Sequence, residues 1–285
     1  MSVCLSTTAQ GIEMENTALV DGINITYDVA GEGDELLLIH SMGSSHELWK
    51  NTMKAAAKLF KVYAIDLPGY GSSEIPDAPY GVPYYVDFIK KFLDEVMLDK
   101  VYLAGISMGG AIAAMFSSKY PDRVKKLVLV APAGLTPLNG VTGMPVVGGA
   151  AYWLISKNKE MFKKNCEDSF YNKSAMPPGL VEERWQKMQD PSYRSMLFKN
   201  TKYLSKVDPA YQASLKNISC PTLIIWGKDD AVMPLSDAEK YLNYIGSSSL
   251  SVIDGCGHVP PLEKTDEFNR LLLTFFGEVG IYYES

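Results

Sequence analysis

The stretch KVYLAGISMGGAIAAMF, residues 100–116, decides the fold. It begins with a β-rich run, passes through the pentapeptide GISMG at 105–109, and continues into small residues at helical spacing. The pentapeptide has the form G-x-S-x-G, which is informative when a strand precedes it and a helix follows. A side chain at Gly105 or Gly109 would collide with the neighbouring strand or helix. We therefore expect Ser107 at the apex of a sharp turn, with its hydroxyl near the positive end of the following helix.

Short apolar runs alternate with helical stretches on both sides of this turn. Continuous apolar runs are typical of strands buried on both faces of a parallel sheet. An alternating pattern over 18–29, broken by Asp21-Gly22, predicts an opening hairpin. Further strands are predicted at 36–39, 62–65, 127–130, 222–226 and 250–253, and helices at 46–59, 84–96, 235–244 and 263–276. This alternation predicts an α/β fold with a mostly parallel central sheet flanked by helices.

The pattern changes between residues 135 and 211, where no strand-like run occurs. Glycine and proline punctuate the first part, and helices are predicted at about 150–166, 180–189 and 192–204. Because this stretch is long and lies between two predicted sheet strands, we interpret it as a helical cap over the carboxyl edge of the sheet. The chain then divides into a first core part (1–134), the cap (135–211) and a second core part (212–285). The alternative is a set of helices packed on one sheet face.

Composition narrows the class of function. The net charge of −6 argues against nucleic acid as a partner, because phosphate binding needs a basic surface. No apolar run is long enough for a membrane span, and the N-terminal residues lack the pattern of a signal peptide, so we expect a cytoplasmic protein. The four scattered cysteines predict buried thiols, with no metal site. We expect a small-molecule substrate and no cofactor, and a homo-oligomer is compatible with the sequence.

A serine hydroxyl becomes a nucleophile at neutral pH when a base and an orienting carboxylate lie beside it. His258 is the best candidate base, since its glycine-flanked loop follows a predicted strand at the edge where Ser107 also lies. Asp230 is the best candidate acid, and Asp229 is its near competitor. Either aspartate is also suited to capping the helix that follows.

Together, these segments resemble α/β-hydrolase fold enzymes of the lidded type, over about residues 20 to 276. The matching pieces are HSMG (40–43), DLPGYGSS (66–73), the Ser107 turn, WGKDD (226–230), and GCGH (255–258) with Glu263. The resemblance selects Asp230 as the acid, because the family's acid is the third residue after the glycine of its W-G-x-x-D segment.

An oxyanion hole follows from the same resemblance. One backbone N–H is that of Met108, directly after the nucleophile. The family takes the second from the loop that begins at His40, which here implies Met42. Ser41 stands where the family commonly has glycine, and it adds a side chain close to the pocket floor.

Serine at the turn excludes the direct-displacement chemistry of family members with aspartate there. The first expectation is hydrolysis of carboxylic esters of small to medium, largely apolar, uncharged substrates through an acyl-enzyme on Ser107, since the cap has no concentrated polar patch. The alternative is C–C bond hydrolysis of meta-cleavage (dienol diketone) products. Residues 128–135 resemble that branch, and Arg184 or Arg194 would supply its arginine, although Ile106 stands where the branch often has asparagine. A ligand-binding receptor with vestigial hydrolysis is the third reading, and the complete triad disfavours it.

Overall fold

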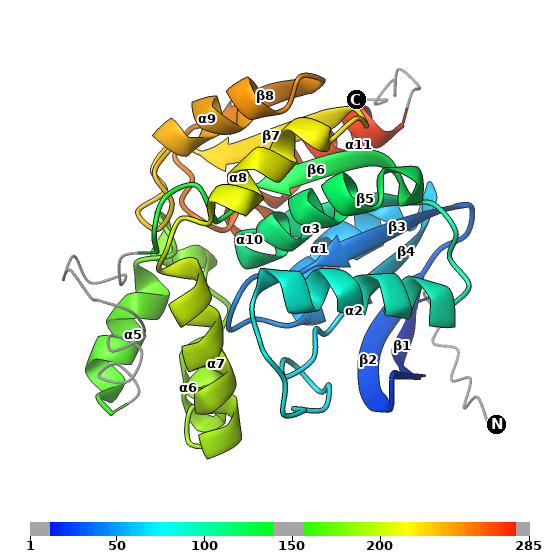
Figure 1. Cartoon of the computed structure of the whole chain (residues 1–285). Coiled ribbons are helices and arrows are strands. Elements are labelled where there is room, and N and C mark those ends of the chain that lie inside the picture. Colours follow the sequence, from blue (N-terminus) through cyan, green and yellow to red (C-terminus); the bar gives the residue numbers. More distant parts are fainter. Residues whose placement is uncertain (1–11, 139–156, 278–285) are drawn as a thin grey trace.

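The computed structural model describes residues 12–138 and 157–277. Its centre is an eight-stranded sheet with the order β1-β2-β4-β3-β5-β6-β7-β8 (Figure 1). The first two strands and β4 pair antiparallel, and all later neighbours pair parallel. The strands are β1 Ile12–Val20, β2 Ile23–Ala30, β3 Asp34–Ile39, β4 Phe60–Ile65, β5 Val101–Ile106, β6 Val124–Val130, β7 Thr222–Gly227 and β8 Ser248–Ile253. The predicted α/β fold with a mostly parallel sheet is confirmed.

The opening hairpin forms at the predicted turn. Asp21 and Gly22 have φ angles of 53° and 80°, and they connect β1 directly to β2. Positive φ at both central residues matches the right-handed twist of the flanking strands, and Asp-Gly is a preferred pair for such a turn.

Two apolar layers sandwich the sheet. Leu37 and Ile39 of β3 belong to one core, whereas Leu36 and Leu38 belong to the other, because successive side chains of a strand point to opposite faces. All four side chains are fully buried. The continuous apolar run of this strand is thus explained by burial on both sides.

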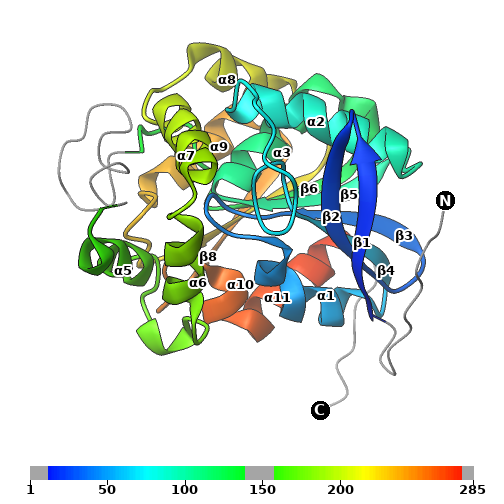
Figure 2. The same ribbon diagram turned by 90° about the horizontal axis from the view of Figure 1, so that it is seen from below.

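Helices cover both faces of the sheet, as Figure 2 shows. The side chains of α2, α3 and α9 belong to the same core as Leu37, and those of α1 and α11 belong to the opposite core. Their bounds are α1 Lys50–Ala56 (preceded by a 3₁₀ turn, His46–Trp49), α2 Val82–Glu95, α3 Met108–Lys119, α9 Ser236–Tyr244, α10 Pro260–Glu263 and α11 Thr265–Phe276. The closing helix predicted from 263 is in fact two, since Lys264 (φ −135°, ψ 50°) leaves the helical region between α10 and α11.

The described part of the connection between β6 and β7 consists of helices joined by loops, with no strand in residues 131–138 or 157–221. Its helices are α5 Lys159–Glu167, α6 Leu180–Lys187, α7 Pro191–Leu204 and α8 Pro209–Ser214. The helix predicted over 150–166 lies partly outside the described residues, and α5 starts only at Lys159. Asn158 is its N-cap, where its side chain accepts a hydrogen bond from the Met161 N–H at 3.1 Å. No helix within the described ranges has the length and apolar character needed to cross a bilayer.

Candidate active site

The turn after β5 has the strained geometry that the G-x-S-x-G pattern predicts. Ser107 has φ 55° and ψ −116°, and α3 begins at the next residue. A Cβ on Gly105 would lie 2.2 Å from the carbonyl oxygen of Gly109, and a Cβ on Gly109 would lie 2.4 Å from the carbonyl oxygen of His40. Side chains are therefore excluded at both positions, and the strand and the helix approach closely enough to hold Ser107 at the apex.

The structure brings His258 and Asp230 together. His258 Nδ1 lies 2.8 Å from Asp230 Oδ2, and the Asp230 side chain is fully buried. The other carboxylate oxygen accepts the backbone N–H groups of Val232 and Met233 at 2.8 and 2.9 Å. The ionised carboxylate only accepts, so Nδ1 donates and Nε2 is left as the unprotonated ring nitrogen. Asp229 is exposed, and only its backbone is tied down, through an N–H bond to the Cys256 carbonyl.

Close packing fixes the loop that carries His258. A Cβ on Gly227, at the end of β7, would lie 2.0 Å from the carbonyl oxygen of Gly257. The backbones of Gly227, which precedes the Asp230 loop, and Gly257, which precedes His258, are therefore in direct contact. This contact explains why position 227 is glycine and why the loops of Asp230 and His258 lie together. At Gly257 a Cβ would instead lie 2.6 Å from the Tyr171 backbone nitrogen.

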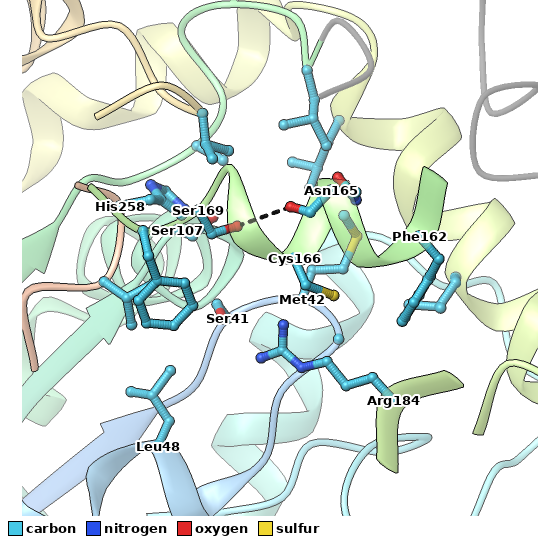
Figure 3. Close-up of a pocket in the computed structure, with 18 of the residues that line it drawn as sticks. Ser41, Met42, Leu48, Ser107, Phe162, Asn165, Cys166, Ser169, Arg184 and His258 are labelled. Carbon is cyan, nitrogen blue, oxygen red and sulfur yellow. Dashed lines mark hydrogen bonds between the residues drawn. The ribbon is translucent and has the colours of Figure 1, made fainter. Parts of the chain in front are cut away.

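Ser107 and His258 line one pocket, shown in Figure 3. Its floor comes from the carboxyl edge of the sheet, including Ser41 and Met42 of the loop after β3. Its other walls come from α5, α6 and α7 and from the segment after α5. Most of these lining side chains are apolar: Leu138, Phe162, Phe170, Met188, Tyr193, Leu197 and Leu204. The arrangement suits a largely apolar organic substrate held above Ser107.

Of the two residues implied for the oxyanion hole, Met108 directly follows Ser107 in the chain and Met42 lines the same pocket as Ser107. Met108 is the first residue of α3, where backbone N–H groups lack intrahelical partners, and its side chain is buried. Met42 lines the pocket, and its sulfur lies 3.8 Å from Thr201 Oγ1 of α7. Their role in binding an oxyanion remains a prediction.

His40 supports the loop after β3 rather than acting as a second base. Burial lowers the pKa of His40 to about 4, so the ring is neutral at pH 7. Nδ1 lies 2.7 Å from the carbonyl oxygen of Ser41, and Nε2 accepts the backbone N–H of Leu67 at 3.1 Å. Both ring nitrogens are occupied, and the ring fixes the start of the loop that carries Met42.

His46 and Asp66 brace the far end of the same loop. Asp66 Oδ1 accepts the His46 backbone N–H at 2.7 Å and lies 3.0 Å from His46 Nδ1. Burial acts to lower the pKa of His46, but the hydrogen bond and charge of Asp66, helped by Asp28 and Glu47, raise it overall. Burial likewise acts to raise the pKa of Asp66, and His46 and His40 lower it overall. The two side chains form a buried pair outside the pocket and tie the loop after β3 to the residue that follows β4.

Arg184 is the charged side chain that α6 directs into the pocket (Figure 3). Its Nε is buried and has no hydrogen-bond partner, and among the described residues no carboxylate forms an ion pair with it. Arg194, the other arginine named from sequence, donates Nη1–H to the carbonyl oxygen of Met188 at 2.7 Å instead. Sequence alone did not separate these two residues. It also missed Asn165, whose side-chain oxygen is buried without a partner at the same pocket.

Within residues 12–138 and 157–277, no cluster of histidine, cysteine and carboxylate side chains is suited to a metal ion. The described cysteines, Cys166, Cys220 and Cys256, are buried free thiols. The site therefore offers a hydroxyl, an imidazole, a carboxylate and a guanidinium as its chemical groups.

Comparison with known proteins identifies relatives of the whole chain. The model of the alpha/beta hydrolase fold family matches residues 35–265. A 2-hydroxy-6-oxo-6-phenylhexa-2,4-dienoate hydrolase of Comamonas testosteroni is 28% identical over 88% of this chain and 90% of its own length. A 2-hydroxy-6-oxononadienedioate/2-hydroxy-6-oxononatrienedioate hydrolase of Pseudomonas putida is 30% identical over 89% of this chain and 92% of its own.

Solved structures agree with this result. A meta-cleavage product hydrolase from Pseudomonas fluorescens IP01 has a TM-score of 0.79 and 28% identity, and the match covers 93% of this chain and 98% of that one. A bacterial membrane phospholipase A has a TM-score of 0.80 and 26% identity, covering 94% and 86%. The chain belongs to the α/β-hydrolase fold family.

Proposed function

We propose that the protein hydrolyses a carbon–carbon bond next to the ketone of a 2-hydroxy-6-oxo-dienoate, with Ser107 as nucleophile. The observation that carries this proposal is Arg184, whose buried Nε has no hydrogen-bond partner, in the pocket of Ser107 and His258. Sequence reasoning ranked ester hydrolysis of an uncharged substrate first. The relatives, which are named as dienoate hydrolases, favour the alternative.

A guanidinium in an apolar pocket needs an anion. Burying one of its N–H groups without a partner costs free energy, and hydrogen bonds to a carboxylate recover it. Arginine presents a planar fork that matches a carboxylate in two parallel hydrogen bonds. A dienoate brings such a carboxylate, and its conjugated carbon chain suits the apolar walls formed by Phe162 and Tyr193. The acid end of the substrate then lies at Arg184 and the reacting ketone at Ser107.

The chemistry proceeds through an acyl-enzyme. His258 Nε2 takes the proton of Ser107 as its oxygen attacks the ketone carbon, and Asp230 holds the ring through Nδ1–H. The N–H groups of Met42 and Met108 bind the resulting oxyanion. Before cleavage the 2-hydroxy dienoate tautomerises to its 2-oxo form, in which the 2-hydroxyl loses its proton and C5 gains one. When the C5–C6 bond breaks, its electron pair delocalises into the 2-oxo group as a dienolate, and His258 returns the proton of Ser107 to the enolate oxygen. Water then releases the acyl group from Ser107, with His258 again as base.

Ester hydrolysis is the second candidate, because Ile106 departs from the asparagine often found before the nucleophile of dienoate hydrolases. The structural likeness to a phospholipase A supports it as well. The same triad serves both reactions, and they differ in the leaving group and in the need for Arg184.

Matched substrates and matched variants separate the candidates. The substrate pair is 2-hydroxy-6-oxo-6-phenylhexa-2,4-dienoate and its methyl ester, followed by loss of dienol absorbance, with p-nitrophenyl acetate as the ester substrate. Arg184→Gln should lower kcat/KM for the free acid by about 10- to 150-fold, the value of a hydrogen bond to a charged group of about 1.5–3 kcal/mol. It should leave p-nitrophenyl acetate turnover nearly unchanged. Arg194→Gln is the matched control and should behave as wild type, and Ser107→Ala should abolish turnover.

Three results would count against the proposal. Efficient turnover of p-nitrophenyl esters without turnover of the dienoate would return ester hydrolysis to first place. Equal rates on the free acid and its methyl ester would remove Arg184 as the carboxylate anchor. Binding of both without turnover by the wild type would favour the receptor reading.

A further inference from the structure

Glu263, the last residue of α10, gathers four backbone N–H groups on its carboxylate. Oε1 accepts those of Gly257 and Val259, at 3.0 and 3.2 Å. Oε2 accepts those of Tyr171 and Asn172, at 2.8 and 3.1 Å. One oxygen therefore holds the two residues that flank His258. The other holds the segment that follows α5.

His258 itself is hydrogen-bonded to the segment that follows α5. The His258 N–H donates to the carbonyl oxygen of Ser169 at 3.0 Å. Three consecutive amides of the His258 loop thus depend on Glu263 and on Ser169. Ser169 and Phe170 also line the pocket, so the segment that is bound to the histidine loop is itself a pocket wall.

We propose that Glu263 is a positioning residue that locks His258 to the segment 169–172, whose first two residues line the pocket. This inference rests on the proposed function only in taking Ser107, His258 and Asp230 as the reacting groups. Glu263 acts through the backbone and does not touch the substrate. The placement of the base is then set jointly by the second core part of the chain and by the segment after α5.

A carboxylate is the side chain that these four donors require. It offers two oxygens with about four acceptor sites and no donor. A glutamine in its place would turn its NH₂ group toward two backbone N–H groups, whichever way it is oriented. The backbone of α10 also fixes the reach of the side chain, because Pro260 and Pro261 begin this short helix and the Glu263 N–H bonds to the Val259 carbonyl at 3.0 Å.

The rate of Ser107 labelling by a fluorophosphonate tests this role without any choice of natural substrate. Glu263→Gln should slow labelling and dienoate kcat by about 10²-fold, the loss expected for a misplaced reacting group, while KM changes little. Glu263→Asp keeps the charge but shortens the reach and should show the same loss. Glu239→Gln, which neutralises an exposed carboxylate of α9, is the matched control and should label at the wild-type rate.

A spectroscopic readout separates positioning from general stability. The proton on His258 Nδ1, bonded to Asp230, should give a low-field proton resonance in the wild type that broadens or disappears in Glu263→Gln. Because that variant leaves two N–H groups without an acceptor, it should also unfold at a lower temperature, so the resonance is compared with that of the control at a temperature where both proteins are folded. Wild-type labelling rates together with an unchanged resonance in Glu263→Gln would overturn the inference.

Hydrogen exchange in the wild-type protein tests whether Glu263 holds both segments, even if the variants fold poorly. The amides of 171, 172, 257 and 259 should be protected to the same degree, since one carboxylate holds all four. Fast exchange at 171 and 172 beside protected 257 and 259 would overturn the proposal. Absence of Ser107 labelling in the wild type would instead contradict the proposed function. The exchange rates would still test the role of Glu263.

Discussion

Replacing Asp230 by asparagine tests how the triad sets the tautomer of His258. Asp230 uses one oxygen for two backbone N–H groups, those of Val232 and Met233, and the other for His258 Nδ1. Asparagine has one acceptor oxygen. Facing it toward the backbone leaves two hydrogen bonds intact, whereas facing it toward His258 leaves two N–H groups without an acceptor. The first orientation wins by about 1–3 kcal/mol, the cost of one additional buried unsatisfied donor.

In that orientation the NH₂ group of asparagine points at His258 Nδ1. The nitrogen must then accept, so the ring proton moves to Nε2, and Nε2 is unable to take a proton from Ser107. A neutral amide at this position of a Ser-His-Asp triad lowers kcat by about 10⁴-fold through the wrong tautomer. That factor corresponds to about 5.5 kcal/mol of lost transition-state stabilisation. Stability should change little, because shape and the backbone hydrogen bonds are retained.

Asp229→Asn is the matched control, since Asp229 is exposed and its side chain does not contact His258. The measurements are dienoate kcat, the second-order rate of fluorophosphonate labelling, and urea unfolding for both variants. A kcat of Asp230→Asn within tenfold of wild type would refute the tautomer argument. An equal loss in Asp229→Asn would refute the assignment of Asp230 itself.

Two further outcomes follow from the packing and the charges around the site. Gly105→Ala should lower the free energy of unfolding by about 1–3 kcal/mol, because its Cβ would lie 2.2 Å from the Gly109 carbonyl oxygen; an unchanged urea midpoint would contradict this. His46→Gln should destabilise the protein more at pH 5.5 than at pH 9. The raised pKa of His46 means that its contribution is complete below its unfolded value, near 6.5, and is lost as pH rises through the folded value. Asp28, Glu47 and Asp66 all act to raise the pKa of His46, and His40 is neutral at both pH values, so an equal destabilisation at pH 5.5 and pH 9 would contradict the raised pKa.

Local pattern was sufficient to predict most strands and helices. The run at 36–39 had to be buried on both faces, and the Asp21-Gly22 pair had to close a two-residue hairpin. The order of the strands was not predictable in the same way, because pairing of β4 with both β2 and β3 depends on contacts between residues distant in sequence. The boundary between α10 and α11 at Lys264 was also not predictable from the sequence, because helices form on both sides of it and no glycine marks it.

The proposed reacting groups could be named from sequence because parallel topology places them at one edge of the sheet. Ser107 follows β5, Asp230 follows β7 and His258 follows β8, and the carboxyl ends of parallel strands meet at one edge. No comparable topological rule predicts whether Arg184 or Arg194 reaches the pocket. The two residues lie on successive helices, and which helix face meets the pocket depends on how α6 and α7 pack against the sheet.

The same limit explains why ester hydrolysis of an uncharged substrate ranked first. Counting polar residues along the cap treats every charge as equivalent, and the cap shows no polar concentration. Substrate charge depends instead on the few polar atoms that remain unpaired inside the pocket, and here the Nε of Arg184 is one of them. The Nε–H of Arg184 is a buried donor beside apolar walls, where low-polarity surroundings strengthen its attraction for an anion. The placement of Arg184 depends on the packing of α6, a contact between residues distant in sequence, and it is the reason why we propose a dienoate rather than an uncharged ester.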